Sequence, residues 1–154
     1  MQLPRPNTSL IGIAGVHYTV SELSRRGLVA LPTIRNTAGY DVIVVSTDGR
    51  KHANIQVKTS SKKVTFFRMP PSEHVKSGPR DFYVLLRWDQ KAGTYDCLLL
   101  TGREAKDAVR SAETAQRRRI RSGSRRVLVP VVWITGPAAH LAKRWRNRWQ
   151  KWKL

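Results

Sequence analysis

The chain has 154 residues, of which 40% are hydrophobic and 25% are charged, a composition that resembles soluble globular domains and excludes wholesale disorder. Its 29 Lys and Arg residues outnumber its 10 Asp and Glu residues and give a formal net charge of +19, so we expect a polyanion, nucleic acid first, as its partner. No apolar stretch reaches the roughly 18 residues that a membrane span needs, and the N-terminus lacks an apolar signal core, so we expect no membrane partner and a cytoplasmic location.

The first half of the chain predicts one helix and three strands. The helix begins with Ser9 as its N-cap and ends before Gly27,. Its apolar side chains recur at helical spacing, at Ile13, Val16, Val20 and Leu23,. Strands are expected at 28–34, 40–46 and 53–59. Pro32 favours an edge position for the first strand,, and a turn joins the other two as a hairpin.

The second half predicts two further strands and two helices. A polar stretch with loops at 69–71 and 77–79 comes first. The elements that follow are strands at 82–88 and 95–100, a helix at 103–119, an apolar run at 127–134 and a last helix at 138–152. Pro130 argues against a central position for the apolar run,. The order predicts an α/β (α+β) fold with a mixed central sheet flanked by helices.

The positive charge is concentrated at the C-terminal end. Residues 114–154 hold 12 basic and no acidic side chains. We therefore expect a single domain over 1–154, in which 114–154 form a strongly basic extension packed on the rest. Cys97 is the only cysteine, so an internal disulfide is excluded, and its apolar neighbours favour a buried free thiol,.

The hairpin carries the residues that could perform chemistry. Side chains alternate along a strand, so Gln56 and Lys58 share one face, and Asp41 near the start of the neighbouring strand would come close to both,. The Asp41 carboxylate, the Gln56 amide oxygen and the backbone carbonyl of Val57 are hard ligands that suit Mg²⁺ or Mn²⁺. Lys58 would add a positive charge that stabilises the charge developing on a reacting phosphate.

An Asp followed by Gln-x-Lys on a hairpin, after an N-terminal helix, resembles the PD-(D/E)XK nuclease superfamily. The branch with Gln in the second acidic position, similar to Mrr-type restriction and Holliday-junction-resolvase-like proteins, matches best over 12–60. The resemblance implies a restriction-endonuclease-like αβββαβ core. It also implies that Asp41 binds the metal ion, that Gln56 is a further ligand and that Lys58 is the catalytic lysine.

The chain departs from that pattern at two places. Tyr40 stands where the family has its name-giving Pro, and Val16 stands where relatives with a GExxxxxEL-type first helix often carry an acidic ligand. Glu22 is the only carboxylate on this helix and is a candidate metal ligand. Its alternative role is local, because Arg25 and Arg26 lie three and four residues further along the helix,.

Two basic clusters predict contacts with nucleic-acid phosphates. The first closes the helix at 103–119 and comprises Arg117, Arg118, Arg119, Arg121, Arg125 and Arg126. Some of these arginines also complement the helix dipole. From the second cluster we expect contacts by Lys143, Arg144 and Arg148. Trp145, Trp149 and Trp152 share one face of the expected last helix, and core packing is favoured over base stacking for this stripe,.

The sequence therefore predicts a metal-dependent endonuclease that hydrolyses phosphodiester bonds in DNA, with Mg²⁺ or Mn²⁺ as cofactor. The sequence also allows a homodimer. A first alternative is a catalytically impaired nucleic-acid-binding module of the same fold, which the missing acidic residue at Val16 favours. A second alternative is an RNA-binding or ribosome-associated basic protein, for which small size and charge are the arguments.

Overall fold

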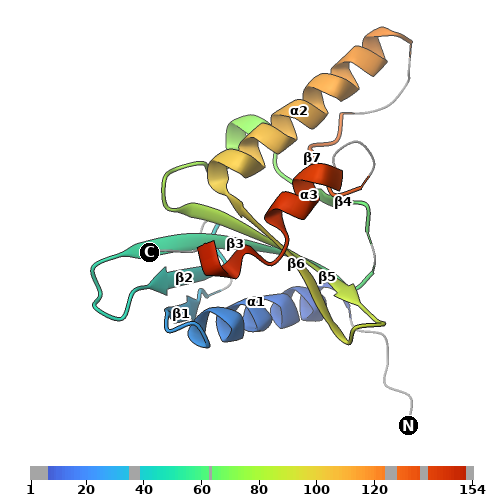
Figure 1. Cartoon of the computed structure of the whole chain (residues 1–154). Coiled ribbons are helices and arrows are strands. Elements are labelled where there is room, and N and C mark those ends of the chain that lie inside the picture. Colours follow the sequence, from blue (N-terminus) through green and yellow to red (C-terminus); the bar gives the residue numbers. More distant parts are fainter. Residues whose placement is uncertain (1–6, 35–38, 63, 124–127, 136–138, 152–154) are drawn as a thin grey trace.

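The computed structural model describes residues 7–34, 39–62, 64–123, 128–135 and 139–151. A five-stranded mixed sheet with the strand order β1-β2-β3-β5-β6 forms its centre, and β3 and β5 are its parallel pair. Figure 1 shows α1 along one face of this sheet and α2 on the other side. The predicted mixed α/β fold is thereby confirmed. None of the helices in the described ranges combines the length and the apolar character that a membrane crossing requires.

The elements follow one another in a simple order. They are α1 (Thr8–Ser24), β1 (Val29–Pro32), β2 (Val42–Val45), β3 (His52–Ser60), β4 (Phe66–Arg68), the 3-10 helix η1 (Ser72–His74), β5 (Asp81–Asp89), β6 (Thr94–Thr101), α2 (Gly102–Arg121), β7 (Val131–Trp133), α3 (Ala139–Trp145) and the 3-10 helix η3 (Arg148–Lys151).

The N-cap of helix α1 lies two residues before the predicted one. The side chain of Asn7, and not that of Ser9, accepts a hydrogen bond from the backbone N–H of Leu10 at 2.9 Å. At the other end Gly27 has a φ of +80°, a conformation that glycine adopts without strain,. The middle of α1 lies close to β3, because a Cβ atom at Gly15 would clash with the side chain of Thr59.

The predicted hairpin of β2 and β3 is present, with Val42 opposite Ile55. Gly49 in its turn has a φ of +71°. Strand β1 lies at the edge of the sheet, where Pro32 predicts it,. Two clusters of buried side chains cover the sheet. The α1-side cluster includes Leu23, Val44 and Ile55, and the α2-side cluster includes Tyr83, Leu85 and Val109.

The connection from β3 to β5 differs from the αβββαβ order that the resemblance implies. Its described residues form β4 and η1 in place of an α-helix, and α2 follows β6. Strand β4 pairs with β7 in a separate two-stranded sheet, with Phe66 opposite Trp133. Strand β7 therefore avoids a central position, as Pro130 predicts. The sequence does not reveal β4, because it is three residues long and its partner lies 65 residues away.

The last helix is shorter than predicted, because α3 ends at Trp145 and Asn147 has a φ of +50°. The chain then crosses the edge of β6. The backbone N–H of Asn147 donates to the carbonyl of Cys97 at 2.9 Å, and Arg146 forms a β-bridge with Leu98. We call residues 142–150 the clasp, because they hold this edge of the sheet.

Two tryptophans of the clasp pack on opposite faces of the sheet. Trp145 belongs to the α2-side cluster and Trp149 to the α1-side cluster. Core packing is therefore confirmed for both, although they do not share one helix face. Trp152 lies outside the described residues.

Candidate functional site

Asp41 lies where β2 separates from β3. Its backbone N–H donates to the carbonyl of Ile55 at 2.8 Å, and its carbonyl accepts a bond from the N–H of Thr33 at 3.0 Å. Its carboxylate oxygen Oδ2 accepts a bond from the backbone N–H of Val57 at 2.7 Å. Because the N–H groups of a strand lie in the plane of the sheet, this carboxylate lies near that plane. It accepts the Val57 N–H, which would donate to a backbone carbonyl if β2 continued.

Gln56 and Lys58 lie on the face of β3 that is turned toward α2. In the parallel register Gln56 is beside Tyr83 and Lys58 is beside Leu85, and both neighbours belong to the α2-side cluster. Both side chains are half-buried, and neither forms a hydrogen bond or an ion pair with another described residue. Asp41 precedes the Val42–Ile55 pair, and its backbone N–H contacts Ile55 of β3 and not Gln56. The structure thus brings the Asp41 carboxylate to the backbone of Val57, whereas the side chains of Gln56 and Lys58 lie on the α2 side of the sheet and do not contact it.

The backbone of Val57 provides a further oxygen. In an antiparallel ladder a residue directs its N–H and its C=O toward the same neighbouring strand, so the Val57 carbonyl is directed to the same side as the N–H that contacts Asp41. A carboxylate, a backbone carbonyl and the Gln56 amide across the ladder are the kind of oxygen ligands that Mg²⁺ prefers. The set contains one carboxylate, which fits an ion that is held together with a substrate phosphate.

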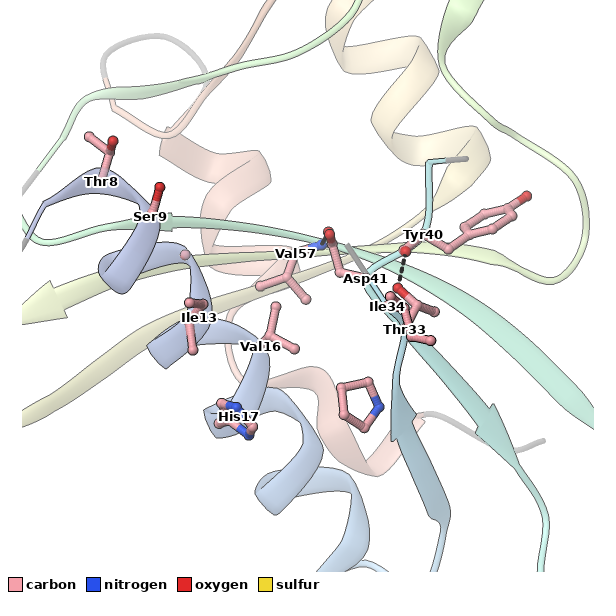
Figure 2. Close-up of a pocket in the computed structure, with 12 residues that line it drawn as sticks. Thr8, Ser9, Ile13, Val16, His17, Thr33, Ile34, Tyr40, Asp41 and Val57 are labelled. Carbon is pink, nitrogen blue, oxygen red and sulfur yellow. Dashed lines mark hydrogen bonds between the residues drawn. The ribbon is translucent and has the colours of Figure 1, made fainter. Parts of the chain in front are cut away.

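A pocket of about 400 Å³ lies between α1 and the end of β1. Figure 2 shows Val16, Asp41 and Val57 turned toward this pocket. Gln56 and Lys58 are not among the residues that line it. Val16, the helix position at which the resemblance leads us to look for an acidic ligand, therefore lines the same pocket as Asp41 with an apolar side chain.

Glu22 does not reach this pocket. Its carboxylate lies 3.2 Å from Nη1 of Arg25 and 2.8 Å from Nη1 of Arg26, so the local pairing described as its alternative role is present. No group of three or more His, Cys, Asp or Glu side chains gathers in the described part of the chain. The helix carboxylate that the resemblance implies as a partner of Asp41 has no counterpart among these residues.

Tyr40 connects the Asp41 segment to the start of β5, which the sequence does not predict. Its hydroxyl donates to Oδ1 of Asp81 at 3.0 Å, and Nζ of Lys76 lies 3.7 Å from the centre of its ring. Burial, followed by the hydrogen bond to Asp81, raises the pKa of Tyr40. The hydroxyl therefore stays protonated near neutral pH and keeps its donor. This tie fixes the backbone immediately before Asp41.

The arginines near the end of α2 are exposed. Arg117, Arg118, Arg119 and Arg121 form no side-chain hydrogen bond or ion pair with any described residue. Figure 1 shows that this end of α2 extends away from the sheet. Arg125 and Arg126, predicted for the same cluster, lie outside the described residues.

The cations of the clasp have different surroundings. Lys143 is exposed, and Arg144 is 67% exposed with its Nη2 atom 3.6 Å from Oε1 of Glu104. Arg148 is 19% exposed and lies 2.9 Å from the same oxygen. Arg146 lies 2.9 Å from Asp96. Arg148, predicted as a phosphate contact, therefore has a carboxylate partner that holds the clasp to the start of α2.

Cys97 is a buried free thiol, as the sequence predicts, and burial raises its pKa. It is not a nucleophile at neutral pH, because the thiolate is the reactive form. The candidate site is therefore the Asp41–Lys58 hairpin together with the exposed cations. Comparisons of the chain with models of protein families, with curated proteins and with solved structures found no match.

Proposed function

We propose that this protein binds DNA and hydrolyses its phosphodiester bonds with Mg²⁺ or Mn²⁺ at the Asp41–Lys58 hairpin. The contact between the Asp41 carboxylate and the Val57 N–H carries the proposal. It holds a carboxylate beside the strand that carries Gln56 and Lys58, and the resemblance to PD-(D/E)XK nucleases implies that these three residues act together. The proposal includes a cytoplasmic location, with which the free thiol of Cys97 is compatible,.

Asp41, Gln56 and the Val57 carbonyl are the residues that would hold the metal ion. A bound divalent ion supplies Lewis-acid stabilisation of the charge that develops on phosphate oxygens. One carboxylate binds such an ion weakly, so we expect the protein to take it up together with the DNA phosphate. Val57 N–H keeps the carboxylate in position before the substrate arrives.

Lys58 is the residue that we propose to act on the reacting phosphate. Its ammonium group forms no ion pair among the described residues, so its charge is not neutralised by a neighbouring carboxylate. A charge in this position acts on the transition state more than on the bound substrate.

Val16 favours a second candidate function, DNA binding without hydrolysis. Its apolar side chain lines the same pocket as Asp41 and Val57, where an acidic residue would complete a two-carboxylate metal site. In this alternative the hairpin keeps the fold and the exposed cations bind the nucleic acid.

Cleavage of linear, supercoiled and branched DNA with Mg²⁺ or Mn²⁺ tests the proposal. We expect the Lys58→Ala variant to cleave about 100-fold or more slowly than the wild type, with unchanged thermal stability and DNA affinity. Lys62→Ala, an exposed lysine just beyond the same strand, is the matched control and should cleave as the wild type does. Equal activity of the wild type and Lys58→Ala contradicts the proposal. A wild type that binds DNA and cleaves none of the substrates contradicts it in favour of the second candidate.

A further inference from the structure

Helix α2 separates its faces clearly. Ala105, Val109 and Ala112 are buried and hold one face of the helix against the rest of the domain. The helix begins with a capping box, in which Thr101 and Glu104 bond to each other's backbone,. It is therefore fixed at its start, and the side of the helix away from these buried residues faces solvent.

A basic stripe runs along one side of this surface. At 100° per residue, five cations fall within about 60° of one another around the helix axis, and they are Arg103, Lys106, Arg110, Arg117 and Arg121. None of them forms a side-chain hydrogen bond or an ion pair with another described residue. Asp107 lies at the edge of the stripe and likewise has no ion-pair partner in the described ranges. The stripe is a surface whose charge the protein itself leaves uncompensated.

We propose that the basic stripe binds the phosphate backbone of a nucleic-acid duplex and leads it to the face that carries Lys58. The proposal rests on the proposed function for the role of Lys58. From Arg103 to Arg121 the helix rises about 27 Å at 1.5 Å per residue. Duplex DNA advances about 3.4 Å per base pair, so the stripe matches about eight base pairs.

The start of the stripe lies close to the candidate site. Thr101, immediately before α2, pairs with Phe82, and Phe82 pairs with Ile55 of β3. Two strand spacings amount to about 10 Å, so α2 begins near β3. Lys58 and Gln56 are turned toward the α2 side of the sheet. A backbone bound along the stripe therefore arrives on the face where both side chains lie.

The chemistry of the stripe favours a duplex over a single strand. Surfaces that bind single strands combine cations with aromatic side chains on which bases stack, and α2 contains no aromatic residue. A duplex offers one charge per about 1.7 Å of axis, which suits a straight row of cations. Contacts of this kind position a nucleic acid without reading its sequence.

Salt titrations of duplex affinity in EDTA, where metal-dependent cleavage cannot occur, test the stripe. The first variant carries Arg103→Gln, Lys106→Gln and Arg110→Gln. The control carries Arg50→Gln, Lys62→Gln and Lys91→Gln, which remove the same charge from exposed positions in loops. Each lost phosphate contact lowers the slope of log affinity against log salt by about 0.9. We expect the stripe variant to lose about 2.7 from the slope on two unrelated duplexes, and the control less than about 1.

A charge-conserving variant distinguishes loss of phosphate contacts from loss of the folded structure. A double variant with Arg103→Lys and Arg110→Lys keeps the charge and should keep the slope. A stripe variant with the wild-type slope, or with the same loss as the control, overturns the proposal. Because these titrations contain no metal, this result leaves DNA cleavage by the wild type untouched. If the stripe variant loses the expected slope but the wild type cleaves no DNA, the proposed hydrolysis is contradicted and the proposed role of the stripe is not.

Discussion

The arginines at the end of α2 and the arginines of the clasp belong to the same basic quarter of the chain, but they meet different partners. Those of α2 (Arg117, Arg118, Arg119 and Arg121) meet solvent in the described structure. Those of the clasp (Arg144, Arg146 and Arg148) lie within 4 Å of carboxylates. The carboxylates, Asp96 and Glu104, come from β6 and from the first turn of α2. The number of basic residues in a sequence segment therefore does not show which of them form ion pairs that stabilise the fold and which are available to bind a ligand.

Burial explains why the two groups should differ in energy. Arg148 and Glu104 are both less than one fifth exposed, so the loss of one partner leaves a poorly solvated charge. An exposed arginine without a partner contributes little to stability, and substitution there changes the free energy of unfolding by about 0.5 kcal/mol or less. The same arginine keeps its full charge for a phosphate.

The clasp tryptophans provide the largest expected effect on folding. Trp149 is 5% exposed, and the guanidinium of Arg26 lies 5.3 Å from the centre of its ring. Trp149→Ala should lower the free energy of unfolding by about 3 to 5 kcal/mol, because it leaves a cavity in the α1-side cluster. Urea denaturation measures this loss. Trp88→Ala is the control, since Trp88 is 37% exposed and should lose about 1 kcal/mol. Equal losses would show that the clasp does not contribute to the core.

Glu104 should have a smaller and pH-dependent effect. Burial by itself raises the pKa of Glu104, but the Thr101 N–H and the Arg148 guanidinium outweigh it and hold the pKa below its ordinary value of 4.5. A carboxylate with a lowered folded-state pKa stabilises the protein above the unfolded pKa, and this stability is lost as the pH falls through the folded pKa. Glu104→Gln should therefore cost about 1 to 3 kcal/mol at pH 7. The cost should shrink as the pH falls below about 4.5.

Chemical denaturation of the wild type and Glu104→Gln between pH 7 and pH 3 checks both statements. Glu73→Gln, an exposed glutamate in η1, is the control and should show little difference at any pH. A Glu104 difference that stays constant over the whole range would contradict a role for its charge in holding the clasp.

Much of the fold could be predicted because its signals are local. The helix signal of α1, the Val/Ile run of β2 and the turn at Gly49 each depend on residues close in sequence. The predicted apolar stripe of α1 is only partly correct, because Ile13 is exposed and the buried face consists of Gly15, Thr19 and Leu23. The break in the last helix could not be predicted in this way. It depends on the bond from Asn147 to Cys97, which lies 50 residues earlier in the chain.

In the candidate site, too, the features that depend on local sequence could be predicted and those that depend on distant residues could not. Alternation along β3 predicts that Gln56 and Lys58 share a face, and the register confirms it. The Val57 N–H that holds Asp41 and the Tyr40–Asp81 bond could not be predicted. The first follows from where β2 ends, and the second joins residues 41 positions apart. The stripe on α2 could not be predicted for another reason, since Arg103, Lys106 and Arg110 are spread along the helix and form no run in the sequence.

Thermal unfolding with and without a DNA duplex tests most directly which cations fold the protein and which bind. A duplex at about 100 times its dissociation constant stabilises the wild type by about 2.7 kcal/mol. A variant with Arg117→Gln, Arg118→Gln and Arg121→Gln should unfold at the wild-type temperature without DNA and lose most of the DNA-induced rise. A variant with Arg144→Gln, Arg146→Gln and Arg148→Gln should unfold at a lower temperature and keep most of that rise. The reverse pattern, or an equal DNA-induced rise in both variants, would contradict the account.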